Sequence, residues 1–160
     1  MTSRAYVAIG ANLGDARATV SRAMDDLDGL PQTRVTARSS LYRSAPVDAT
    51  GPDYVNAVAE VRTTLSAPDL LAALQRIEAA HGRTRPFPNA PRTLDLDLLL
   101  HGDAVVVSPA LTLPHPRMHQ RAFVLVPLAE LAPDAAIPGA GPVADLLAGV
   151  AGQRLDKLGP

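Results

Sequence analysis

Residues 92–100 carry the most restrictive pattern in this chain, because two aspartates stand two positions apart inside the apolar run Arg-Thr-Leu-Asp-Leu-Asp-Leu-Leu-Leu. Side chains on a β-strand alternate between faces, so Asp95 and Asp97 would share one face and the intervening leucines the other. The two Cα atoms would then lie about 6.5–7 Å apart. Such a pair predicts a strand whose polar face either is open to water or meets a cation.

The pattern alone leaves both interpretations open. An antiparallel strand with one solvated face shows the same alternation. A hard cation such as Mg²⁺ also favours paired carboxylates, and it commonly brings phosphates as further ligands. Neighbouring arginines favour the cation, because metal ions and guanidinium groups together neutralise phosphate charge during phosphoryl-type transfer. These arginines are Arg83, Arg85, Arg92, Arg117 and Arg121.

Composition bounds the class of protein. The 160 residues suit a single domain, residues 1–160, and the absence of cysteine excludes disulfides, thiolate metal sites and cysteine nucleophiles. A net charge of −1 argues against binding of nucleic acid, which usually needs a basic excess. No signal peptide or membrane-spanning stretch is evident, so we expect a cytoplasmic protein without a membrane partner. We also expect a monomer.

Helix and strand signals follow the order β-α-β-β-α-β. Asp15 and Ser66 stand at helix N-cap positions, and the glycines of residues 10–14 are expected to form a strand-to-helix turn. As one antiparallel sheet with helices packed on one face, this order is the ferredoxin-like α+β fold, with C-terminal helical and short-strand extensions. The expected strands cover 4–10, 33–43, 54–65 and 94–100, and the expected helices cover 16–27, 67–81, 121–131 and 143–150.

Three further side chains have both a functional and an ordinary interpretation. Tyr54 could stack on a flat heterocycle, or it could be an ordinary strand-edge tyrosine. His115 stands between two prolines that fix its backbone, and it could donate to a phosphate or simply belong to a rigid turn. Phe123 lies in an apolar run that is typical of a core. No P-loop signature is present, so a bound nucleotide would need a different phosphate site.

Several segments together resemble the 6-hydroxymethyl-7,8-dihydropterin pyrophosphokinase family. They occur in the family's order and spacing between residue 5 and about residue 134. The resemblance implies a ferredoxin-like α+β fold and transfer of the β,γ-pyrophosphoryl group of ATP to the pterin hydroxymethyl group, with AMP as the second product. The matching segments are residues 6–14, 53–57, 75–78, 91–97, 113–116 and 121–123.

The resemblance also implies roles for residues on the phosphate side. Asp95 and Asp97 would hold two Mg²⁺ ions, and Arg83 and Arg92 would stabilise charge during the transfer. The residues that would contact ATP are Gln75, Glu78, Arg83, Arg92, His115, Arg117 and Arg121. Arg117 stands near the position where the family carries an aromatic residue, and it is a further phosphate contact in this interpretation.

On the pterin side, the resemblance implies that Tyr54 and Phe123 sandwich the ring and that Asn56 contacts its polar edge. Ser44, Ala45 and Val47 would line the same pocket. The loops at 44–53 and 83–91 would close as lids that exclude water. The second lid departs from the family, because Asn89-Ala90 stands where some members carry Trp-Gly.

A non-catalytic module on the same fold, which binds a small regulatory molecule, is the alternative. It does not account for paired carboxylates beside several arginines. Magnesium-dependent binding of an ATP analogue would separate the two hypotheses.

Overall fold

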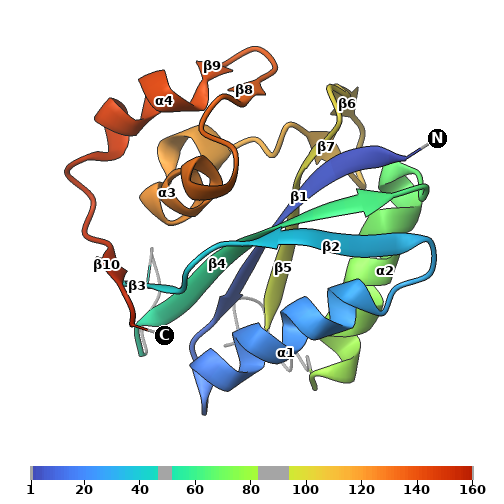
Figure 1. Ribbon diagram of the computed structural model, residues 1–160, viewed down its shortest axis with the longest axis horizontal. Helices are drawn as coiled ribbons and strands as arrows, with labels where there is room; N and C mark the ends of the chain where they lie inside the picture. Colours follow the sequence, from blue (N-terminus) through green and yellow to red (C-terminus); the bar gives the residue numbers. More distant parts are fainter. Residues whose placement is uncertain (1, 47–51, 83–93, 160) are drawn as a thin grey trace.

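The computed structural model describes residues 2–46, 52–82 and 94–159 and shows one main antiparallel sheet (Figure 1). The sheet has six strands in the order β10-β3-β4-β1-β5, and β2 also pairs with β4. Its strands are β1 (Ser3–Ala11), β2 (Thr33–Arg38), β3 (Tyr42–Ser44), β4 (Tyr54–Thr63), β5 (Asp95–His101) and β10 (Asp156–Lys157).

Helices α1 (Ala16–Asp28) and α2 (Ala67–Ala80) begin where the sequence predicts. The Asp15 carboxylate accepts a hydrogen bond from the Ala18 amide (3.1 Å), and the Ser66 hydroxyl accepts one from the Asp69 amide (3.2 Å). Each contact satisfies one of the amides that a helix start leaves without an intrahelical partner. The central part of the chain therefore has the predicted ferredoxin-like order.

One predicted strand is divided in the structure. The stretch 33–43 forms β2 and β3, because Ser39 takes over the pairing with β4 between them. Its amide donates to the Val58 carbonyl (2.9 Å), and its hydroxyl accepts from the Val58 amide (2.9 Å). The side chain thus replaces a backbone carbonyl in the ladder, and β3 resumes at Tyr42 against Asn56.

Helices cover both faces of the sheet. α1 and α2 pack on the face that carries Val7 and Ile9, as predicted. The C-terminal part covers the opposite face, where Tyr6 and Val58 contact the cluster around α3 (Figure 1). Its elements are η1 (Met118–Gln120), α3 (Ala122–Leu131), β8 (Ala136–Ile137), β9 (Gly141–Pro142), α4 (Val143–Leu146) and η2 (Leu147–Val150). The short hairpin of β6 (Val106–Val107) and β7 (Thr112–Leu113) precedes them and packs with the cluster on the α1 and α2 side, to which Val106 and Leu113 belong.

A carboxylate ties α3 to the sheet. Glu130 accepts hydrogen bonds from the Tyr42 hydroxyl (2.7 Å) and from the amide (2.9 Å) and hydroxyl (3.0 Å) of Ser40. These contacts fix the C-terminal end of α3 beside the start of β3. Within the residues that the structure describes, none of the helices is both long and apolar enough to cross a bilayer.

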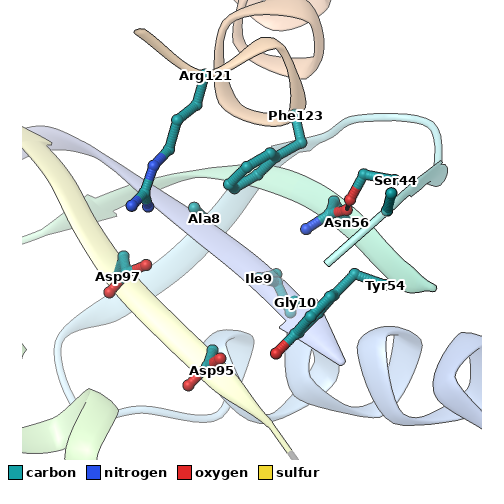
Figure 2. Close-up of a pocket in the computed structure, with 11 residues that line it drawn as sticks. Ala8, Ile9, Gly10, Ser44, Tyr54, Asn56, Asp95, Asp97, Arg121 and Phe123 are labelled. Carbon is teal, nitrogen blue, oxygen red and sulfur yellow. Dashed lines mark hydrogen bonds between the residues drawn. The ribbon is translucent and has the colours of Figure 1, made fainter. Parts of the chain in front are cut away.

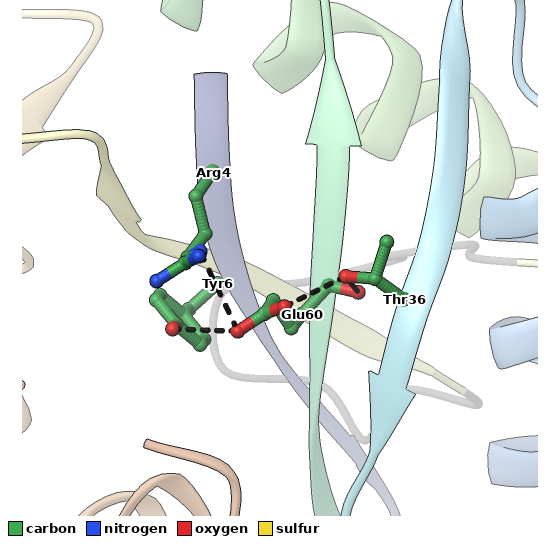
Figure 3. Close-up of polar contacts among 4 residues, drawn as sticks. All are labelled: Arg4, Tyr6, Thr36 and Glu60. Carbon is green, nitrogen blue, oxygen red and sulfur yellow. Dashed lines mark hydrogen bonds and ion pairs between the residues drawn. The ribbon is translucent and has the colours of Figure 1, made fainter. Parts of the chain in front are cut away.

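A polar cluster joins β1, β4 and β2 on the α3 side (Figure 3). The Glu60 carboxylate accepts hydrogen bonds from Tyr6 (2.7 Å) and Thr36 (2.8 Å), and it lies 3.8 Å from the Arg4 guanidinium. Burial alone would raise the pKa of Glu60, but these donors outweigh it and hold the pKa below the usual 4.5. Burial and the Glu60 carboxylate raise the pKa of Tyr6 to about 12.

We predict that Glu60→Gln lowers the free energy of unfolding at pH 7 by about 1–3 kcal/mol, because hydrogen bonds to a charged acceptor are lost. A carboxyl whose pKa is lower in the folded state stabilises above its unfolded pKa and loses this effect as the pH falls through the folded pKa. The gap between wild type and variant should therefore shrink below pH 4.5.

Urea unfolding between pH 7 and pH 3 measures this gap. Asp103→Asn, which changes an exposed carboxylate, is the matched control and should follow the wild-type pH profile. A gap for Glu60→Gln that stays constant over the whole range would contradict the prediction.

Candidate active site

A cavity of about 170 Å³ lies on the α3 side of the sheet, between β5, β1, β4 and the start of α3 (Figure 2). It brings together most of the site residues predicted from the sequence. Its lining consists of Ala8, Ile9, Gly10, Ser44, Ala45, Tyr54, Asn56, Asp95, Asp97, Arg121 and Phe123.

Strand register places the polar side chains in rows across the cavity. Gly10 pairs with Asn56 on one side and with Asp95 on the other. Two residues earlier, Ala8 pairs with Val58 and Asp97. Figure 2 shows both carboxylates beside the cavity, so the predicted common face of the aspartates is confirmed.

The floor of the cavity was missed by the sequence analysis. Gly10, predicted as the last residue of the strand and the first of a turn, lies inside β1, which continues to Ala11. A Cβ at this position would stand 3.3 Å from Asn56 Nδ2. Ala8 is its neighbour on the same face. A signal was present, because two successive positions on one face of a buried strand carry almost no side chain. The small residues leave room for a flat molecule to lie on the sheet.

Asn56 is held in one orientation by Ser44. The Ser44 hydroxyl donates to Asn56 Oδ1 at 2.5 Å, and both residues are buried. With its oxygen engaged, the amide directs Nδ2 into the cavity (Figure 2). A heterocycle with an acceptor on its edge would meet a preoriented donor here.

Two aromatic side chains approach the cavity from different elements. Phe123 descends from α3, and Tyr54 rises from the start of β4 (Figure 2). The Arg121 guanidinium carbon lies 5.5 Å from the Phe123 ring centroid, within cation–π range. Phe123 is half-buried: it lines the cavity and also packs against the edge of the buried cluster around α3, to which its apolar neighbours belong.

His115 lies on the other side of Asp97, where both residues line an adjoining hollow. Its amide donates to the Leu99 carbonyl (3.0 Å), and its Nδ1 accepts from the Arg117 amide (3.2 Å). Burial lowers the pKa of His115; Asp97 opposes this shift, and Arg121 and Arg117 reinforce it. The ring is thus neutral at pH 7, with Nδ1 as acceptor and the proton on Nε2.

Glu78 lies outside the cavity lining and holds the aspartate-bearing strand. Its side chain is buried in α2, and its Oε2 accepts from the Leu96 amide at 2.9 Å. Leu96 stands between Asp95 and Asp97, so this contact fixes the backbone that carries both carboxylates. The predicted ATP contacts of Glu78 and of Gln75, which is exposed on the same helix, stay predictions.

Other predicted residues fall elsewhere. Arg117 lines a basic hollow beside the cavity, together with Arg121. Val47, Arg83 and Arg92 lie outside the described residues, as do residues 47–51 of the first expected lid loop and the whole of the second, 83–91. Their predicted roles therefore stay predictions.

The donor set of the site fits a hard cation. Asp95 and Asp97 are partly exposed oxygen donors on one strand face, which suits Mg²⁺ with water or phosphate as the remaining ligands. No three His, Asp or Glu side chains converge among residues 2–46, 52–82 and 94–159. Most ligands of an ion held there would therefore come from the bound molecule or from water.

Fold and cavity together define a ferredoxin-like α+β domain with carboxylates and an arginine on one side of a pocket and an aromatic, amide-bearing wall on the other. Residues 6–133 match the model of the 7,8-dihydro-6-hydroxymethylpterin-pyrophosphokinase (HPPK) family. The chain belongs to this family.

Relatives agree over nearly the full length. The chain is 45% identical to the 2-amino-4-hydroxy-6-hydroxymethyldihydropteridine pyrophosphokinase of Pseudomonas aeruginosa, over 99% of this chain and 98% of the relative. It is 41% identical to the enzyme of the same name from Haemophilus influenzae, over 98% of each chain. A Plasmodium falciparum HPPK-DHPS triple mutant has a similar structure, with a TM-score of 0.75 over 92% of this chain and 43% of that one. Its 11% sequence identity supports the fold alone.

We predict that charge changes around His115 shift its pKa in opposite directions. Asp97→Asn should lower the pKa further, because a carboxylate that raises it is removed, whereas Arg121→Gln should raise it. NMR titration of the imidazole in magnesium-free protein measures both shifts. Asp103→Asn serves as the control, and shifts of the same sign in the two variants would contradict the arrangement.

Proposed function

We infer that this chain catalyses transfer of the pyrophosphoryl group of ATP to the hydroxymethyl group of 6-hydroxymethyl-7,8-dihydropterin, a step of folate biosynthesis. In this reaction the hydroxymethyl oxygen loses its proton and bonds to the β-phosphorus, the bond from the β-phosphorus to the α-phosphate oxygen breaks, and AMP leaves with that oxygen. Family membership and 45% identity over nearly the whole of both chains support this activity.

The observation that carries the assignment is the division of one cavity into two chemically different sides. Asp95, Asp97 and Arg121 line one side, whereas Tyr54 and Asn56 line the other. A charged phosphate chain and a flat, neutral heterocycle would therefore meet at the boundary. Holding both reactants in one cavity replaces a bimolecular encounter by an oriented one, which is the main requirement of phosphoryl-type transfer.

The pterin side provides shape and polarity for a bicyclic ring. Tyr54 and Phe123 offer aromatic faces, and Gly10 leaves the sheet surface flat between them. Asn56, oriented by Ser44, presents a donor to the ring edge. We assign Ala45 and Val47 to the same pocket on the strength of the family resemblance.

On the phosphate side, Asp95 and Asp97 are the residues that would hold two Mg²⁺ ions. When bound with ATP, these ions supply charge neutralisation at the phosphate oxygens. The fit rests on the shared strand face and partial exposure of the two carboxylates. The buried Glu78 carboxylate keeps that strand in place through the Leu96 amide.

Cationic and neutral donors complete the phosphate side. Arg121 carries its charge into the cavity, and Arg117 adds a second charge in the adjoining hollow. A neutral His115 donates from Nε2 to an anionic oxygen without binding a further proton. By resemblance, Arg83 and Arg92 would stabilise the charge that develops during transfer, and Gln75 and Glu78 would contact the nucleotide.

We also propose a cytoplasmic monomer that acts on small molecules and binds no nucleic acid. A net charge of −1 supports the last point. Gel filtration coupled to light scattering measures the mass in solution.

Asp97→Asn should fold normally but lose at least about 100-fold in transfer rate, because a group that neutralises transition-state charge is removed. The assay supplies ATP, Mg²⁺ and the hydroxymethyl dihydropterin and identifies the nucleotide product. Wild type should release AMP, and Asp103→Asn should match it. ADP as the only product would indicate an ordinary kinase, and no turnover at all would refute the assignment.

Phe123→Leu should weaken pterin binding by about 5–150-fold, the size of a lost stacking contact, and leave affinity for an ATP analogue nearly unchanged. Titration calorimetry with each ligand separates the two effects. Val126→Leu, a change on the same helix outside the cavity lining, is the control. Equal losses for both ligands would place Phe123 in the general architecture instead of the pterin wall.

A further inference from the structure

Gln153 makes an unusual pair of contacts across the start of α3. Its Oε1 accepts from the Ala122 amide at 2.9 Å, and its Nε2 donates to the Gln120 carbonyl at 2.8 Å. The two partners are the immediate neighbours of Arg121. One side-chain amide from the C-terminal segment therefore bridges the peptide groups on both sides of the arginine that enters the cavity.

The backbone at Arg121 needs such a contact. Arg121 is the N-cap of α3, with extended dihedral angles (φ −124°, ψ 117°), and its own side chain makes no capping hydrogen bond. Arginine has no acceptor with which to satisfy the first helical amides. Gln153 supplies an acceptor to the first of them from 31 residues away. The N-cap position is thereby free to carry a cation instead of a capping side chain.

Gln153 is itself carried by an anchored segment. On one side its amide donates to the Val150 carbonyl (3.0 Å), and Val150 is buried in the cluster around α3. On the other side β10 pairs with β3, and the Leu158 amide donates to the Leu41 carbonyl (2.8 Å). The side-chain amide is thus presented from a segment that is fixed at both ends.

We propose that Gln153 is a positioning residue, which holds the 120–122 backbone so that the Arg121 guanidinium faces the phosphate side of the cavity. This inference rests on the proposed role of Arg121 in nucleotide binding. Figure 2 shows Arg121 reaching from the start of α3 towards Asp97. Rotation of the peptide groups beside Arg121 would redirect this side chain, whereas Phe123 is held by the helix that follows.

Gln153→Met tests the proposal, because methionine keeps the length of the side chain and removes both hydrogen bonds. We expect affinity for a non-hydrolysable ATP analogue with Mg²⁺ to fall by about 3–10-fold, the size of one or two exposed hydrogen bonds. Affinity for the pterin alone should stay within about twofold. Hydrogen exchange at the Ala122 amide should become faster.

A double-mutant cycle separates positioning from simple stabilisation. In an Arg121→Ala background, Gln153→Met should have no further effect on analogue affinity, because its action passes through the missing side chain. Thr36→Ala is the matched control, since Thr36 is exposed and makes two hydrogen bonds, both to Glu60 on the sheet. It should lower stability and leave the affinity unchanged.

Three results would overturn the proposal. They are unchanged analogue affinity in Gln153→Met, an equal loss in the Arg121→Ala background, and a loss matched by Thr36→Ala. If the wild type binds the analogue but transfers nothing, the proposed function is refuted. The comparison of analogue affinity between wild type and Gln153→Met would still decide the positioning role of Gln153. A wild type that binds no nucleotide would refute both.

Discussion

The site depends on one constraint, the register of β1 between β4 and β5. This pairing places Asn56, Gly10 and Asp95 in a single row, with Asp97 in the next. Because side chains alternate along the part of β5 that carries the two aspartates, a slip of one residue there would turn both carboxylates into the apolar layer under α1 and α2. The buried leucines of β5 make that slip unfavourable, so the core that stabilises the fold also fixes the chemistry of the opposite face.

The cavity is formed between two layers, the sheet and α3. The sheet supplies the floor and the carboxylates, and α3 adds the guanidinium and an aromatic ring from above. Both ends of α3 are attached by side-chain hydrogen bonds. At its start the Gln153 side chain accepts from the Ala122 amide, and near its end the Glu130 side chain accepts from the Tyr42 hydroxyl of the sheet. Together with the buried cluster between α3 and the sheet, these attachments hold the two layers in place around the space for a flat ligand.

Much of this arrangement follows from local patterns. Period-two alternation was enough to place Asp95 and Asp97 on one face, and capping residues located the starts of α1 and α2. The division at Ser39 was not predictable, because a hydroxyl that replaces a ladder carbonyl leaves no periodic signal. Gln153 was missed for a similar reason, since its partners lie about 30 residues away and no local motif links them. Phe123 was attached to the pocket only by family resemblance, because its apolar neighbours are typical of a core.

The glycine in β1 has a consequence for inhibitors of this enzyme. The floor of the slot at Gly10 is main chain, whereas its walls include the side chains of Asn56 and Tyr54, whose atoms lie 3.3 and 3.7 Å from where a Cβ at Gly10 would stand. A compound that fills it must be planar, and bulk for selectivity has to be attached at the rim. A methyl group added at this glycine would crowd the Asn56 amide, to which we assign the pterin edge, so under that assignment resistance by this route would also weaken substrate binding.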